Sequence, residues 1–188
     1  MMERIAASPR LKAKIAGIFY LLTFLTGGVA LFVRGRLGFA AGLVAGACYI
    51  AVTLLFYHIF KPVNRRLSLL TASFSLVGIA IGPLSLFLLA LSHINPLVFF
   101  GFYCLLIGYL IFRSTFLPRI LGALMAFGGL GWLTFLLPQL ANYLFPYNLA
   151  PGILGEGSLT LWLLVIGVIV PRWEEQASLE RATESARV

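Results

Sequence analysis

Six long apolar runs, separated by short connections, constrain this chain more than any other feature of its sequence. A helix needs about 20 mostly apolar residues to cross the roughly 30 Å of hydrocarbon in a bilayer. The six runs that meet this requirement lie at residues 15–33, 37–60, 67–92, 94–112, 120–145 and 151–170. They lack the polar–apolar alternation of membrane barrel strands. The sequence therefore predicts an all-α integral membrane protein that folds as a bundle of six transmembrane helices.

The composition agrees with a lipid environment. Hydrophobic residues make up 61% of the 188 residues and charged residues 11%, whereas soluble domains carry about 25% charged residues. The net charge of +8 would suggest nucleic-acid binding in a soluble protein, but here the basic residues lie between apolar runs. We therefore expect membrane lipids around the chain and no nucleic-acid partner.

The basic residues predict an orientation, because cytoplasmic loops of membrane proteins are enriched in lysine and arginine. One side of the predicted bundle carries Arg4, Arg10, Lys12, Lys14, Lys61, Arg65, Arg66, Arg113, Arg119 and Arg172. The other side carries only Arg34 and Arg36. We expect both termini to be cytoplasmic. Residues 1–14 then form a basic tail, residues 15–170 the transmembrane domain, and residues 171–188 a charged tail that is expected to be solvated and frayed.

Proline and glycine give further expectations. Pro83 and Pro138 lie inside the third and fifth runs and are expected to kink those helices. Glycines at four-residue spacing allow helices to approach closely in a membrane. On the second and third runs these are Gly38, Gly42, Gly46, Gly78 and Gly82. They would pack one bundle internally, or mediate a homodimer or a contact with another membrane protein.

The side chains that could carry chemistry are few. Cys48 and Cys104 lie inside apolar runs, where cysteine usually acts as a small hydrophobic residue. His58 and His93 are expected on opposite sides of the membrane, so they cannot share a metal ion. The chain has no aspartate, and Glu156 is its one membrane-level carboxylate, which excludes a paired-carboxylate mechanism within one chain. We expect no catalytic residue, metal or cofactor, and no enzymatic activity.

Glu156 needs an explanation. A last helix that began after Ser158 would have 12 residues, a length of about 18 Å that is too short for a bilayer. A start at Pro151 gives a helix long enough to span and places Glu156 inside it, near its outer end. There Glu156 would either tie the last helix to the rest of the protein or belong to an outward-facing polar pocket. The candidate pocket residues are Arg34, Arg36, His93, Gln139, Asn142 and Glu156.

Several segments resemble a family of bacterial multi-pass membrane proteins that is defined by a domain of unknown function. The segments are K-P-V-N-R-R, then F-L-P-R-I-L-G, then G-E-G-S-L-T-L-W-L-L. Family members typically have R-P-V-N-R, G-x-x-L-P-R-I-L-G and G-E-x-x-L-x-L-W-L-L in this order. The resemblance covers roughly Leu55 to Val170 and implies a bacterial cytoplasmic membrane protein with no assigned activity.

The sequence departs from the family at polar positions. Typical members carry an arginine in the third helix, a histidine in a G-F-H-C segment, and acids in the second and fifth helices. The matching positions here are Ser75, Tyr103, Tyr49 and Phe135. Glu156 is the part of this polar set that remains.

Three functions remain open from the sequence. The leading hypothesis is a membrane protein with a small outward-facing pocket for a lipid or small amphiphile. The second is a non-catalytic helix-packing partner or assembly subunit of another membrane protein. A small transporter or channel is the third, and the scarcity of charges along any path argues against ion conduction.

Overall fold

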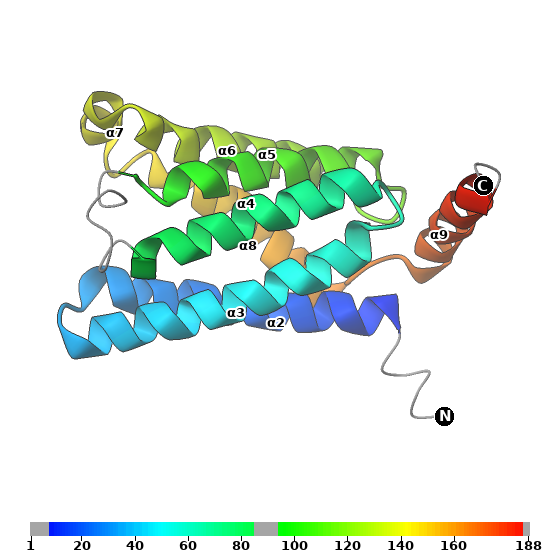
Figure 1. Cartoon of the computed structure of the whole chain (residues 1–188), viewed down its shortest axis with the longest axis horizontal. Coiled ribbons are helices and arrows are strands. Elements are labelled where there is room, and N and C mark those ends of the chain that lie inside the picture. The colour runs from blue at the N-terminus through cyan, green and yellow to red at the C-terminus, as the bar shows by residue number, and fades with distance from the viewer. Residues whose placement is uncertain (1–7, 85–93, 186–188) are drawn as a thin grey trace.

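The computed structural model describes residues 8–84 and 94–185, and every regular element in these two ranges is helical (Figure 1). In chain order the elements are α2 (Pro9–Phe32), α3 (Arg36–Phe60), α4 (Arg65–Leu84), α5 (Leu97–Arg113), α6 (Arg119–Leu133), the short 3-10 helix η2 (Thr134–Leu136), α7 (Pro138–Leu144), α8 (Leu149–Val165) and α9 (Val170–Ser185).

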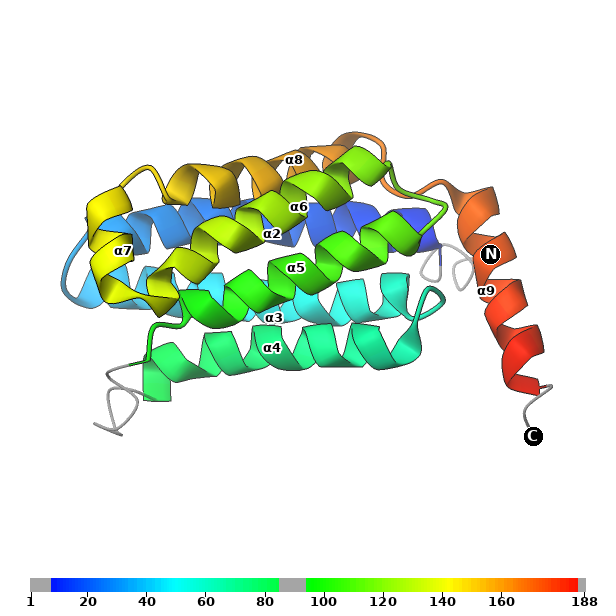
Figure 2. The ribbon, with the colours of Figure 1, turned by 90° about the horizontal axis from the view of Figure 1, so that it is seen from above.

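Six of these helices form one bundle. Figures 1 and 2 show α2, α3, α4, α5, α6 and α8 running side by side, with α7 at one end and α9 at the other. We refer to these as the α7 end and the α9 end. The α2–α3, α5–α6 and α6–α8 pairs make the most extensive contacts.

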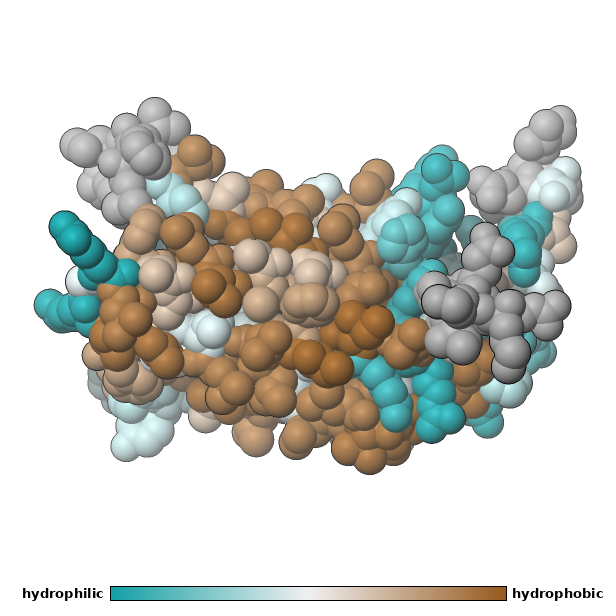
Figure 3. Space-filling model, turned by 90° about the horizontal axis from the view of Figure 1, so that it is seen from below, coloured by the Kyte–Doolittle hydropathy of each residue, from teal (hydrophilic) through white to brown (hydrophobic). Residues whose placement is uncertain are grey.

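Four helical segments are long and apolar enough to cross a membrane, namely α2, α3, α4 and α6 taken together with η2, and a fifth span results if the bent α8–α9 pair is taken as one. The bundle also has a wide apolar belt between its ends, with polar residues gathered toward the ends (Figure 3). Residues on the outside of this belt, such as Leu25, Leu54 and Leu161, are more than half exposed. The fold class predicted from the sequence is thus confirmed as all-helical, with four to five apolar helices of spanning length.

Two predicted helices end earlier than expected. The fifth run does not continue through Pro138 with a kink: α6 ends at Leu133, and Pro138 is the first residue of α7, where its missing N–H costs no hydrogen bond. The sixth run is also divided. Gly167 has a φ of 76°, which glycine adopts without strain, and the chain leaves the bundle there at an angle of 105° between α8 and α9.

The C-terminal segment is ordered as a helix, so the expectation of a frayed end from Arg172 is wrong for residues up to 185. The α9 helix is held against the end of the bundle by side chains. Trp173 Nε1 donates to the Ile59 carbonyl at 2.9 Å, and Gln176 Oε1 accepts from the Thr115 backbone N–H at 3.1 Å. These bonds fix α9 to the ends of α3 and α5.

Most of the predicted packing glycines contact their own chain. A Cβ on Gly46 would lie 3.5 Å from Ile79, and one on Gly78 would lie 3.2 Å from Phe99 and Phe100. Gly38 and Gly42 face the α2–α3 turn and Ala30, while Gly82 lies in the last turn of α4. Gly46 and Gly78 therefore serve the internal packing of one bundle, whereas a Cβ on Gly82 would meet no described atom within 4 Å.

Closer helix contacts occur at glycines that the sequence analysis did not select. Gly101 and Gly108 of α5 lie against Gly129 and Gly122 of α6, where an added Cβ would come within 2.8 Å of a backbone oxygen or a leucine side chain. The same is true of α6 and α8, at Gly131 and Gly155. These contacts bring α6 close to both of its neighbours.

Candidate functional site

Glu156 lies in the interior of the bundle. It is the eighth residue of α8, about 10 Å along the helix from its first residue, and its side chain is 6% exposed. The prediction that Glu156 belongs to a helix is confirmed. A buried carboxylate needs hydrogen-bond donors, because removing charge from water without compensation is costly.

Four other helices supply these donors. Glu156 Oε2 accepts hydrogen bonds from the Tyr20 hydroxyl at 2.7 Å and the Tyr49 hydroxyl at 3.4 Å. Glu156 Oε1 accepts from Trp132 Nε1 at 2.7 Å and from the Cys104 thiol at 3.7 Å. The donors belong to α2, α3, α6 and α5 respectively, so one carboxylate on α8 connects five helices. We call Glu156 and these four residues the Glu156 site.

Close helix packing places the strongest donors. A Cβ on Gly152, one turn before Glu156, would overlap the Trp132 indole, so this glycine makes the space that the ring occupies. On the other side, a Cβ on Gly17 would lie 3.0 Å from the Leu164 backbone nitrogen. This glycine lets α2 approach α8 and brings Tyr20, one turn later, within reach of the carboxylate.

Aromatic rings surround the carboxylate. The Tyr49 ring packs edge-to-face on Tyr20, Phe100 and Tyr103, with ring centroids 5.4, 5.0 and 5.7 Å apart. Trp132 also lies beside Phe135, at a centroid distance of 6.4 Å. Aromatic faces attract cations, whereas Tyr20, Tyr49 and Trp132 meet the carboxylate through their O–H and N–H groups.

Two polar atoms near the site are buried without a hydrogen-bond partner among the described residues. One is the Tyr103 hydroxyl, on a side chain that is fully buried, and the other is Asn148 Oδ1. Asn148 lies just before α8 at the α7 end, and its Nδ2 donates to Thr134 Oγ1 at 3.1 Å. Unpartnered polar atoms are uncommon in protein interiors, and a bound water or ion is one common explanation.

Three of the four positions at which the family resemblance implies a charged group lie in the same interior, and the fourth, Phe135, is half-buried. Tyr49 and Tyr103 belong to the aromatic surroundings of Glu156. Ser75 of α4 is buried and lies 2.6 Å from the Thr53 hydroxyl of α3. Phe135, in η2, touches the Trp132 ring. This chain thus has hydroxyls and rings at the positions where charged groups are typical of the family.

The other predicted pocket residues lie elsewhere. Arg34 and Arg36 are exposed at the α2–α3 turn, and Gln139 and Asn142 are exposed on α7. His93 lies outside the described residues. In the described part of the chain, the donors to the Glu156 carboxylate are Tyr20, Tyr49, Cys104 and Trp132, and none of them is a residue that the sequence analysis grouped with Glu156.

The sequence held one signal for the donors that were missed. Tyr20 and Tyr49 lie inside apolar runs, whereas tyrosines in membrane proteins concentrate at the two interfaces. A tyrosine at that depth needs a partner for its hydroxyl. Cys104 was interpreted as a small hydrophobic residue, and the structure shows that its thiol also donates to Glu156. Cys48 and Cys104 are both buried and free.

The comparison with known families agrees with the resemblance seen in the sequence. Residues 34–95 and 88–167 match the family described as Domain of unknown function (DUF4386). The chain belongs to the DUF4386 family. The match includes α3 to α8 and therefore four of the five residues of the Glu156 site, whereas Tyr20 on α2 lies before it.

The comparison with individual proteins adds no activity to this assignment. An uncharacterized protein of Archaeoglobus fulgidus is 28% identical over 124 residues, which are 63% of this chain and 76% of that protein. No solved structure matches the chain. The arrangement of the site itself is therefore the basis for assigning a function to this DUF4386 protein.

Proposed function

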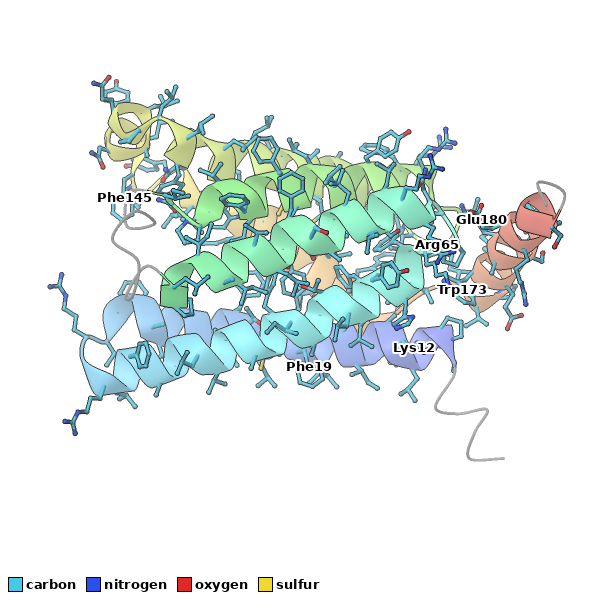
Figure 4. All side chains as sticks on the ribbon, in the orientation of Figure 1. Lys12, Phe19, Arg65, Phe145, Trp173 and Glu180 are labelled. Atoms are coloured by element: carbon cyan, nitrogen blue, oxygen red, sulfur yellow. The ribbon has the colours of Figure 1, made fainter. Side chains whose placement is uncertain are left out.

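We propose that the chain crosses a bacterial cytoplasmic membrane six times, with both termini in the cytoplasm. The helices α5 and α8 have 17 residues each, a length of about 25 Å that lies at the short end of the spanning range. Both lie beside α2, α3, α4 and α6 (Figure 2). Figure 4 supports the orientation: Lys12 and Arg65 lie at the same end of the bundle as Trp173 of α9, and Phe145 lies at the other.

Labelling of single cysteines tests this topology. In whole cells, a membrane-impermeant maleimide should react with Arg36→Cys at the α2–α3 turn and not with Arg66→Cys at the start of α4. After the membrane is opened, both variants should react. Labelling of Arg66→Cys from outside intact cells would overturn the orientation, and Cys48 and Cys104, both buried, give little background.

For the activity, we propose that the Glu156 site binds a small amphiphile whose polar head carries an ammonium group. The observation that supports this most strongly is that the Glu156 carboxylate is buried. The described groups that donate hydrogen bonds to it are all uncharged. If Glu156 is ionised when the ligand binds, hydroxyl, thiol and indole donors do not neutralise its charge. A cationic head group would compensate that charge, and the aromatic rings around it suit an ammonium ion.

We propose that such a ligand enters from the α7 end. Asn148 Oδ1 is an acceptor without a described partner at this end, and Glu156 is the acceptor deeper in the bundle, eight residues along the chain. Two hydrogen-bond acceptors, one at this end and one deeper in the bundle, favour a ligand that donates hydrogen bonds. The exposed outer surface of α8, including Ile153, Leu154 and Leu161, offers apolar area to an alkyl tail. In the proposed topology this end faces outward.

The test uses dodecylamine as the probe and dodecanol, which has the same alkyl chain and an uncharged head group, as the control. For the purified full-length protein in a mild detergent, dodecylamine should raise the thermal unfolding midpoint and dodecanol should not. A ligand at 100 times its Kd stabilises the folded state by about 2.7 kcal/mol. Native mass spectrometry should show one bound amine.

Two variants decide whether the effect comes from the site. Glu156→Gln should abolish the stabilisation by dodecylamine, and Glu175→Gln, which removes an exposed carboxylate on α9, should retain it. Equal stabilisation of Glu156→Gln would refute the proposal. A second protein that copurifies in stoichiometric amount, with no effect of the amine, would favour the packing-partner alternative.

A further inference from the structure

A cleft at the α9 end of the bundle has a different character from the Glu156 site. It lies between the α5–α6 connection and the beginning of α9, and its volume is about 480 Å³. Its walls include Thr115 and Pro118 from the connection, Arg119 from the start of α6, and Arg172 and Glu175 from α9. The sequence analysis used the basic residues of this end only for orientation.

The walls of the cleft are joined by hydrogen bonds. Arg172 Nη1 donates to the Thr115 carbonyl at 3.3 Å, and Gln176 Oε1 accepts from both the backbone N–H and the hydroxyl of Thr115, at 3.1 and 3.2 Å. The Ile169 N–H also donates to the Phe116 carbonyl at 3.3 Å. These contacts hold α9 across the end of the bundle, where its 105° angle to α8 places it along the surface.

The cleft has an excess of positive charge. Two guanidinium groups, those of Arg119 and Arg172, line it together with one carboxylate, that of Glu175. Arginine is suited to phosphate groups because its planar donors match two oxygens at once. The charge therefore favours an anion that carries a phosphate.

An apolar surface begins directly beside this charge. Ile120, the residue after Arg119, is 64% exposed, and Phe127 and Leu130 are 51% and 59% exposed. Their spacing of seven and three residues puts them on one face of α6. A ligand with its phosphate in the cleft could lay an alkyl chain along this face, which a free phosphate ion could not do.

We propose that the cleft binds the phosphate of an anionic phospholipid and that the exposed face of α6 contacts an acyl chain of the same molecule. Anionic lipids of the cytoplasmic leaflet are attracted to basic residues close to the membrane surface. The assignment to this leaflet rests on the proposed topology, whereas binding of the lipid itself does not.

The experiment measures lipid retention by the purified full-length protein with native mass spectrometry. Phosphatidylglycerol and phosphatidylcholine with identical acyl chains are added in equal amounts. The protein should retain phosphatidylglycerol in preference, and the double variant Arg119→Gln/Arg172→Gln should lower that preference by about 30-fold, the effect expected for two basic residues near a membrane. The matched double variant Arg34→Gln/Arg36→Gln, at the α7 end, should leave it unchanged.

Two further measurements test the proposal independently of the double arginine variant. Glu175→Gln removes the carboxylate of the cleft and should increase retention of phosphatidylglycerol, which tests the site even if the arginine variant does not fold. Inorganic phosphate at millimolar concentration should not displace the lipid. Equal retention by the Arg119→Gln/Arg172→Gln variant, or displacement by inorganic phosphate, would overturn the proposal. Because detergent solution has no leaflets, a reversed topology would not affect these results.

Discussion

Replacing Gly155 with alanine is expected to lower the free energy of unfolding by about 1–3 kcal/mol, the range for overpacking a well-packed interior. The added Cβ would overlap the Leu124 carbonyl and lie 3.3 Å from the Met125 Cα. Both are backbone atoms, so no side chain can rotate away, and α6 and α8 would have to separate. Thermal or denaturant unfolding in a mild detergent measures the loss.

Gly157 is the matched control for this substitution. It lies on the same helix, two residues further on, and a Cβ there would meet no described atom within 4 Å. Alanine has a higher helix propensity than glycine, by about 1 kcal/mol. Gly157→Ala should therefore be neutral or stabilising. Equal destabilisation by both substitutions would show that helix propensity or insertion, rather than the α6–α8 contact, controls the stability of α8.

Replacing Glu156 with alanine is expected to lower the free energy of unfolding by about 2–4 kcal/mol. The Tyr20 hydroxyl and the Trp132 indole N–H would remain buried without their 2.7 Å acceptor, and each such group costs about 1–3 kcal/mol. Glu156→Gln should cost less because its amide oxygen can still accept one of these bonds. The same unfolding measurements apply.

Two tyrosines separate the loss of the hydrogen bond from a general effect of substitution in the core. Tyr20→Phe removes a hydroxyl that donates to Glu156 at 2.7 Å and should lower stability. Tyr103→Phe removes a buried hydroxyl that has no described partner and should not. If Glu156→Ala leaves stability and yield unchanged, the carboxylate is neither a structural tie nor an organising centre of the site.

The helical fold was predictable because hydropathy reports directly on burial in lipid. The breaks at Leu133 and Val165 were not, because apolar residues continue through both turns. Phe135, Leu136 and Leu137 keep the fifth run apolar across η2, and the sixth run stays apolar through Gly167 to Val170. Hydropathy averages do not register a glycine with positive φ or a proline that begins a helix.

The site was predictable only in its centre. Glu156 stood out because it is a single carboxylate in a long apolar region. Its partners depend on which helix faces meet, and this is decided by small residues such as Gly17 and Gly152, whose neighbours the sequence does not show. Charge pairing suggested Arg34 or Arg36, but both are exposed at the α2–α3 turn, and the described donors to the carboxylate are all uncharged groups.

The four donors to Glu156 are synthesised before Glu156 itself, and this order has a consequence for assembly of the bundle. Tyr20, Tyr49, Cys104 and Trp132 all precede Glu156 in the chain, by between 136 and 24 residues. Membrane helices are made in sequence, so in the proposed topology the donors on α2, α3, α5 and α6 enter the bilayer before their common acceptor exists. Only the arrival of α8 completes the polar interior, and a nascent chain that ends before it carries four donors with no carboxylate to receive them.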